Sequence, residues 1–367
     1  MFFNLLRTVS FRNLSDKEIF TGAKDVFLVG ENGQGKSNFL EALYFCAYAS
    51  SFRVVRDSEI AYNGKKDFCA QVNLSESVHD DILVKIENGK KSILINGKNV
   101  NDRKEMLSIT PCIVFCHEDM EFVNGSPERR RWFFDQSLSL YDPVYLEDLR
   151  RYRRVLKSRN SLLKDFSQRR TQENPDKVLD ALDPQLVMYG LKLMEKRKKA
   201  VKDFADIFQP LYEEVCGIGG ISVLYTQSWK EKTEQDIVAH LKQKRQAEMA
   251  AGLSLSGPHR DRYVFTQNSQ GNITDFTVRA STGQRRLLAL LLRTAQACLY
   301  SSQTKQNPVL LLDDVLLEMD GQKRRKFLSV LPAYDQAFYT FLPEEPYQQY
   351  KKPDTLIYTV KEGELYI

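Results

Sequence analysis

Long hydrophobic runs are missing from this sequence of 367 residues. No apolar stretch approaches the roughly 20 residues that a helix needs to cross a bilayer, so we expect no membrane-spanning segment and no membrane partner. The stretch from Met1 to Arg7 also lacks the basic start and the small-residue cleavage site of a secretory signal. The expected location is therefore cytoplasmic.

Cysteine and histidine are scarce, with six and four residues respectively. The cysteines mostly fall in apolar stretches, which favours a reducing compartment over a disulfide framework. Cys112, Cys116 and His117 are close in sequence, but no second pair completes a zinc site, so none is expected. His259 either senses nucleotide or braces a turn, and the lack of a visible acid–base partner favours bracing.

A strong net charge is absent too, because 53 Lys and Arg are balanced by 48 Asp and Glu, which leaves +5. The basic residues are nevertheless concentrated in residues 129–170 and 196–202. Such clusters are typical of surfaces that bind polyanions, and DNA contact is expected at Arg129–Arg131 and Arg150–Arg154. Glu128 lies among them, as other acids do, so a solvated helix face remains an equally good interpretation.

The sequence does contain a glycine-rich phosphate loop. Its residues Gly30-Glu31-Asn32-Gly33-Gln34-Gly35-Lys36-Ser37 match G-x-x-x-x-G-K-[ST] at every position. An apolar stretch precedes the loop and helical spacing follows it, which is the context that the motif needs. Backbone N–H groups and a helix N-terminus would then point at phosphates. We expect this loop to bind a nucleoside triphosphate, with ATP favoured.

Two side chains of the loop have expected roles of their own. Lys36 should reach the β and γ phosphates, which makes it a candidate catalytic residue. Ser37 should bind Mg²⁺ through its hydroxyl group. ATP and Mg²⁺ are therefore the expected cofactors.

Two acids follow an apolar strand, Leu310-Leu311-Leu312, near the end of the chain. The carboxyl ends of parallel strands face the ligand crevice, so Asp313 is expected to hold Mg²⁺ through its water shell. Asp314 is the expected catalytic residue that orients or deprotonates the attacking water. The pair could instead simply cap the following helix, but the phosphate loop weakens that interpretation.

A third motif, Ser281-Thr282-Gly283-Gln284, precedes a leucine-rich helical run. A serine at this position caps a helix, and a helix N-terminus rich in Ser and Gly also binds anions. Both interpretations can hold together.

Strand signals at both ends of the chain enclose a mainly helical middle. The predicted class is α/β, with a mixed or parallel sheet and antiparallel hairpins over residues 66–100, where Asn88-Gly89 and Asn96-Gly97 form the turns. We predict a discontinuous ATPase head from residues 1–120 and 253–367, and a helical arm from residues 121–252.

These motifs together resemble the RecF family of DNA-repair ATPases, which is related to the SMC and ABC-type ATPases. The matching stretches come in family order and extend nearly from end to end: 30–43, 51–53, 123–135, 256–261, 281–290 and 308–320. The resemblance implies an ABC-type P-loop ATPase head with a helical lever-arm insertion. It also implies that Ser281, Gly283 and Gln284 form a signature motif that contacts the ATP bound by a second subunit. Asp320 would be the acid of the D-loop at the same interface.

The function implied by the resemblance is ATP-dependent DNA binding in recombinational repair and replication. ATP would drive a homodimer onto single-stranded or duplex DNA or gap junctions, and assist recombinase loading and the SOS response. Hydrolysis would be weak, DNA-dependent and Mg²⁺-dependent, and RecR and RecO would be partners. Asp314, where many ABC enzymes have Glu, fits slow turnover. Ser37 replaces a common Thr, and Arg262 stands where a second acid is usual.

Two other functions share the phosphate loop. An ABC-transporter ATPase subunit would carry a switch histidine where this chain has Thr340. A small-molecule P-loop kinase would not need the motif at Ser281 and would not form dimers with ATP. Both are less consistent with the sequence than the RecF-like function.

Overall fold

The computed structural model describes residues 2–62, 64–168, 176–231, 233–317 and 319–367. They form two compact units, of which the first comprises Met1–Asp119 and Arg286–Ile367 and the second Met120–Arg285. Residues 253–285, which the sequence assigns to the head, therefore group with the second unit, because strand β10 in this segment pairs with β9. The limits of the functional domains stay a prediction.

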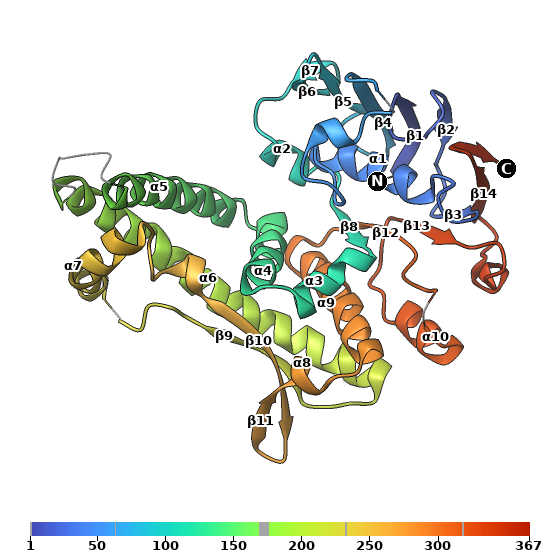
Figure 1. Cartoon of the computed structure of the whole chain (residues 1–367). Helices are drawn as coiled ribbons and strands as arrows, with labels where there is room; N and C mark the ends of the chain where they lie inside the picture. The colour runs from blue at the N-terminus through green and yellow to red at the C-terminus, as the bar shows by residue number, and fades with distance from the viewer. Residues whose placement is uncertain (1, 63, 169–175, 232, 318) are drawn as a thin grey trace. The chain divides into compact units, whose positions relative to one another are not determined.

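The first unit contains a mixed, mainly parallel sheet (Figure 1). Its strands in spatial order are β15 (Glu364–Tyr366), β14 (Leu356–Lys361), β3 (Asp25–Val29), β13 (Gln336–Phe341), β12 (Val309–Leu312) and β8 (Cys112–Phe115). Only the β14–β15 pair is antiparallel. The strands β3, β13, β12 and β8 are buried along their whole length, as expected for a parallel sheet covered on both faces. In this sheet β3, which precedes the phosphate loop, lies beside β13. Strand β12, which ends just before Asp313 and Asp314, lies on the other side of β13.

A second sheet of this unit is antiparallel. Its order is β2 (Glu18–Phe20), β1 (Phe2–Val9), β4 (Phe68–Ser75), β5 (Asp81–Glu87), β6 (Lys90–Ile95) and β7 (Lys98–Asn99). Burial alternates along β5, so one face is internal and the other external. Positive φ angles at Asn88 and Gly89 close the β5–β6 hairpin as predicted.

Helix α1 (Lys36–Tyr48) belongs to the core of the first unit. It contacts β4 and β5 of the antiparallel sheet and β8 and β13 of the parallel one. Nearly all its side chains are buried, so it is not an amphipathic surface helix. The phosphate loop therefore precedes a helix that the core holds in place. The unit also contains α2 (Lys104–Leu107), α10 (Gly321–Ser329) and short 3₁₀ turns at Asp57–Glu59, His117–Asp119 and Tyr347–Tyr350.

The second unit is mainly helical. Its elements are α3 (Met120–Asn124), α4 (Pro127–Tyr141), α5 (Pro143–Ser167), α6 (Asp176–Cys216), β9 (Ile221–Thr226), α7 (Glu234–Ala251), a 3₁₀ turn (Pro258–Arg260), β10 (Arg262–Ser269), β11 (Asn272–Asp275) and α8 (Phe276–Arg279). Helix α9 (Thr282–Thr304) begins here and continues in the first unit. Figure 1 shows α5 and α6 side by side. They are antiparallel, because Asp142 pairs with Lys196 and Arg159 with Asp183.

One segment differs from the sequence prediction. Residues 221–226, expected within a helical region, form β9, because Ile221 and Val223 are buried while their backbone pairs with β10. Residues 276–279 form the short helix α8, and Asp275 caps it by accepting a hydrogen bond from the Thr277 backbone N–H.

Candidate nucleotide-binding site

The phosphate loop has a backbone that only glycine adopts readily. Gly33 and Gly35 have φ angles of 78° and 120°. A Cβ atom on Gly30 would lie 2.4 Å from the backbone oxygen of Val360 in β14. The fold of the loop itself therefore requires glycine at these positions.

Lys36 is buried at the start of α1. Its Nζ donates to the backbone oxygens of Gly30, at 2.6 Å, and Glu31, at 3.2 Å. Both partners are neutral carbonyls, and no described carboxylate forms a hydrogen bond with the ammonium group. Its charge is available for a phosphate.

Neighbouring segments hold the loop from outside, and sequence reasoning did not identify them. Asn13 donates from Nδ2 to the Gln34 backbone oxygen at 3.3 Å, and accepts from Asn38 Nδ2 at 2.7 Å. The Gly363 N–H donates to the same Gln34 oxygen at 2.8 Å. No local motif indicates Asn13 or Gly363, because both act through contacts distant in sequence.

A buried carboxylate lies behind the loop on α1. Glu41 is completely buried and pairs with Arg12, whose Nε and Nη2 atoms each lie 2.9 Å from one carboxylate oxygen. Ser51 also donates to Glu41, and Arg53 Nη1 lies 3.5 Å from it. The matching stretch 51–53 is thus connected to the phosphate-loop helix.

Ser37 and Asp313 are brought together by α1 and β12. The Ser37 hydroxyl donates to Asp313 Oδ1 at 2.7 Å. Burial raises the pKa of Asp313 to about 6; the Ser37 hydrogen bond opposes this shift and the neighbouring Asp314 adds to it. A hydroxyl and a carboxylate are the hard oxygen ligands that Mg²⁺ prefers, so this donor set fits the ion.

Asp314 adopts a left-handed conformation with φ of 50°. Its N–H donates to Thr340 Oγ1 at 2.7 Å, and that hydroxyl donates to Asp314 Oδ1 at 2.8 Å. Thr340 lies near Asp313 and Asp314 because β13 runs parallel to β12, so that both strands end at the same edge of the sheet. Thr340 therefore fixes the orientation of Asp314.

The Ser281 motif lies in the second unit and forms a reciprocal capping box. The Ser281 N–H donates to Gln284 Oε1 at 2.8 Å, and the Gln284 N–H donates to Ser281 Oγ at 3.2 Å. Gly283 is exposed, and a Cβ atom there would meet nothing within 4 Å. Packing within the chain therefore does not require a glycine at 283.

Asp320 is the N-cap of α10 in the first unit. Its carboxylate accepts from the Lys323 N–H at 2.9 Å, and Lys323 Nζ lies 3.0 Å from it. The Lys323 hydrogen bonds lower the pKa of this exposed carboxyl. Asp320 thus remains ionised and exposed at the start of a helix.

The basic residues of the second unit fall into two groups. Arg130 donates to the Val123 and Tyr263 backbone oxygens, and Arg131 donates to the Asp261 backbone oxygen. These two arginines, expected on a DNA surface, thus form internal contacts. The exposed members include Arg129, Arg151, Arg153, Arg154, Lys157, Lys198, Lys199 and Lys202. Arg169 and Arg170 lie outside the described residues.

His259 is half-buried and lies between two hydrogen-bond partners. Its Nε2 is 3.1 Å from the Ser254 backbone oxygen, so it must donate there, and Nδ1 then accepts from the Tyr152 hydroxyl at 2.7 Å. Burial lowers the pKa of His259 to about 4. A neutral histidine bonded on both sides braces the turn before β10.

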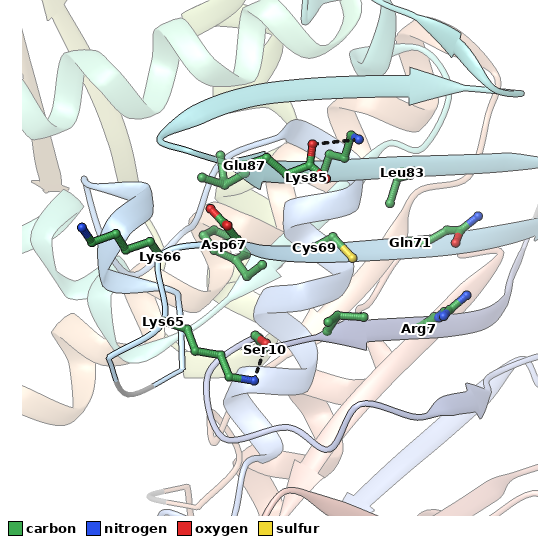
Figure 2. Close-up of a pocket in the computed structure, with 13 residues that line it drawn as sticks. Arg7, Ser10, Lys65, Lys66, Asp67, Cys69, Gln71, Leu83, Lys85 and Glu87 are labelled. Atoms are coloured by element: carbon green, nitrogen blue, oxygen red, sulfur yellow. Dashed lines mark hydrogen bonds and ion pairs between the residues drawn. The ribbon is translucent and has the colours of Figure 1, made fainter.

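A separate cavity of about 640 Å³ lies on the outer face of the antiparallel sheet (Figure 2). Arg7 of β1, Cys69 of β4 and Lys85 of β5 point into it, with Lys65 and Lys66 from the loop before β4. It shares no lining residue with the predicted site. Among the described residues, no cluster of His, Cys, Asp and Glu could hold a metal ion, and no helix is long and apolar enough to cross a membrane.

The phosphate loop before a buried helix and the acids at the end of a nearby parallel strand are the features of a P-loop ATPase head. The family model described as "RecF/RecN/SMC N terminal domain" matches residues 2–363. The DNA replication and repair protein RecF of Treponema pallidum (strain Nichols) is 41% identical, over 98% of this chain and 99% of its own length. The chain therefore belongs to the RecF family.

Other comparisons agree with this assignment. The protein of the same name from Shouchella clausii (strain KSM-K16) is 32% identical over 93% of this chain and 92% of its own length. The solved "recombination mediator protein RecF-ATP in RecFOR pathway" is 26% identical, with a TM-score of 0.85 over 99% of this chain and 96% of that one. An SMC head bound to a ScpA domain shares the fold, with a TM-score of 0.56 over 99% of this chain and 95% of that one, at 14% identity.

Proposed function

We propose that this chain is an ATP-dependent DNA-binding protein of replication and recombinational repair, acting in the cytoplasm with RecR and RecO partners. The Ser37–Asp313 hydrogen bond is the observation that carries the nucleotide part of the proposal. It joins the phosphate loop to the acid pair through two oxygens suited to Mg²⁺. The bound ion would neutralise phosphate charge and position the triphosphate.

The residues of this chain divide the remaining work. Lys36 binds the β and γ phosphates, with the backbone N–H groups from Gly30 to Ser37 around them. Asp314, held by Thr340, orients the attacking water and accepts its proton. A carboxylate one methylene shorter than Glu, fixed by a neighbouring hydroxyl, supports weak turnover, which DNA would stimulate.

ATP is proposed to join two protomers. Ser281, Gly283 and Gln284 of one protomer would contact the γ-phosphate held by the other, with Asp320 at the same interface. The open space around Gly283 supports this, because a glycine near a helix start costs stability without any packing need in its own chain. Close approach of the ATP held by the other protomer would explain why a glycine stands at position 283.

DNA is proposed to bind through the exposed basic residues of the second unit, in duplex, single-stranded or junction form. Phosphate contacts from Arg and Lys supply affinity that does not depend on base sequence. Dimerisation would double the number of these contacts. ATP would thereby control DNA affinity, recombinase loading and the SOS response.

Light scattering with and without ATP–Mg²⁺ tests the shared nucleotide. The wild-type protein should form dimers only with ATP–Mg²⁺. Ser281→Arg should bind ATP normally, because the loop is untouched, but should neither dimerise nor hydrolyse ATP. Thr282→Arg at an exposed neighbouring position measures the effect of a bulky cation alone. Normal dimerisation by Ser281→Arg would contradict the assignment of this turn.

A further inference from the structure

A buried ion pair in the first unit has incomplete hydrogen bonding. Glu345 lies in the loop after β13, Arg324 lies on α10, and each is no more than 9% exposed. Arg324 Nη1 is 3.8 Å from Glu345 Oε1, which is too long for a hydrogen bond. Within the described residues, Glu345 Oε1 and Arg324 Nε have no hydrogen-bond partner. Buried polar atoms in this condition are uncommon and costly, so the pair calls for an explanation.

Glu345 is anchored where the phosphate loop and the catalytic strand meet. Its Oε2 accepts from the Leu342 N–H at 2.8 Å. The preceding residue, Phe341, accepts at its carbonyl from the Gly30 N–H at 3.1 Å, and Thr340 comes just before it. The Glu345 carboxylate is thus held at the end of β13, which also contacts the phosphate loop through Phe341 and Asp314 through Thr340.

Glu345 also interacts electrostatically with charged residues of the predicted nucleotide site. Burial raises its pKa; Arg324 and Lys36 oppose that shift, and Asp314 adds to it. The Glu345 carboxylate therefore interacts electrostatically with both Lys36 and Asp314.

Arg324 connects the pair to the Asp320 turn. Its Nη2 donates to the Met319 backbone oxygen at 3.3 Å, and its N–H donates to the Asp320 backbone oxygen at 2.9 Å. Asp320 is the N-cap of the helix that carries Arg324. A movement of the guanidinium group would therefore move the carbonyl next to Asp320.

We propose that Glu345 is a positioning residue that couples occupancy of the phosphate site to the conformation of the Asp320 turn through Arg324. Negative charge arriving at Lys36 cancels the attraction between Lys36 and Glu345, so the carboxylate gains by closing on Arg324. The guanidinium then moves toward the loop after β13 and away from Met319. The inference rests on the proposed function, because it needs ATP at the loop and Asp320 at the subunit contact.

Amide hydrogen exchange over residues 319–329, with and without ATP–Mg²⁺, tests the coupling independently of hydrolysis. Wild type should show an ATP-dependent change in this segment. Glu345→Gln should lose that change and weaken ATP-dependent dimerisation about tenfold, while ATP affinity stays within about threefold. Glu344→Gln is the matched control, because its side chain is adjacent and exposed. Arg324→Gln should reproduce the defect, and the double variant should be no worse than either single one.

Equal behaviour of Glu345→Gln and Glu344→Gln would overturn the coupling. A single variant could fold poorly because it leaves one buried charge without its partner. The Arg324→Gln/Glu345→Gln protein, in which both side chains are neutral, then tests the coupling. A normal ATP-dependent exchange change in this double variant would also overturn the coupling. A purely structural pair would lower Tm without altering the ATP response. Failure of wild type to bind ATP or dimerise would instead overturn the proposed function.

Discussion

Two buried cations, one in each compact unit, have different surroundings. In the second unit, Arg197 donates to Asp135 at 2.8 Å, to Asp261 at 3.0 Å and to the Pro258 carbonyl at 2.7 Å. In the described part of the first unit, the hydrogen-bond partners of Lys36 are the Gly30 and Glu31 carbonyls. The charge of Arg197 is thus balanced by buried carboxylates, whereas that of Lys36 is not.

Other pairs extend the contrast. Arg159 in the second unit bonds Asp183, Glu248 and Ser254 at distances of 2.6 to 2.8 Å. Asp313 in the first unit has one short side-chain hydrogen bond, and its raised pKa reflects the incomplete compensation. A matched buried charge holds a fold together, and an incompletely matched one is ready for a ligand.

The largest expected effect comes from the unmatched lysine. Lys36→Ala should weaken ATP binding by roughly 100-fold or more and abolish ATP-dependent dimers, because no other side chain replaces its charge. Calorimetric titration and light scattering measure the two effects. Unfolding by urea should change little, since the lost partners are two carbonyls. Retained ATP binding would show that the loop is not the phosphate site.

A matched charge should behave in the opposite way. Arg197→Met should destabilise the second unit by about 3–5 kcal/mol, because Asp135 and Asp261 would both lose their buried cationic partner. Urea denaturation measures the loss. Lys196→Met is the control; it removes a half-exposed pair with Asp142 and should cost less than about 1 kcal/mol. Equal costs would show that the buried Arg197 pairs stabilise the fold no more than a half-exposed pair does.

Acid should weaken Mg²⁺ binding at the site. The pKa of Asp313 is raised to about 6, so the protonated form persists to higher pH than in a free aspartate. Mg²⁺-dependent ATP affinity should be retained above pH 6 and should fall up to about tenfold per unit as the pH drops below it. Titrations with and without Mg²⁺, corrected for protonation of ATP itself, isolate this effect. Asp313→Asn should abolish it.

The smallest effect concerns single exposed arginines. Arg154→Gln should reduce the slope of log affinity for DNA against log salt by about 1, as expected for one lost phosphate contact. Arg325→Gln removes an exposed charge from the first unit and should leave the slope unchanged. A wild-type slope near zero would rule out a phosphate-dominated interface altogether.

The sequence could predict the parts that depend on local pattern. The phosphate loop, the α/β class and the hairpin turn at Asn88-Gly89 each follow from spacing or turn chemistry within a few residues. The contact between Ser37 and Asp313 joins positions 276 residues apart. It was expected only because the two motifs occur together.

Other features could not be predicted, because composition does not show which side of a helix is buried. Arg130 and Arg154 have the same chemistry, yet one bonds to backbone carbonyls and the other is exposed. Strand β9 was missed because its partner β10 lies beyond an intervening helix. Glu345 belongs to no motif, and only the fold brings it near Lys36 and Asp314.

The hairpin of β14 and β15 has a consequence for how the protein matures. The Glu362 N–H donates to Gln34 Oε1, a contact between residues 328 positions apart, and Gly363 bonds the same loop residue. During synthesis on the ribosome, the phosphate loop leaves the ribosome long before β14 and β15 are made. Nucleotide affinity should therefore be acquired late in synthesis, when the last strands close over the first.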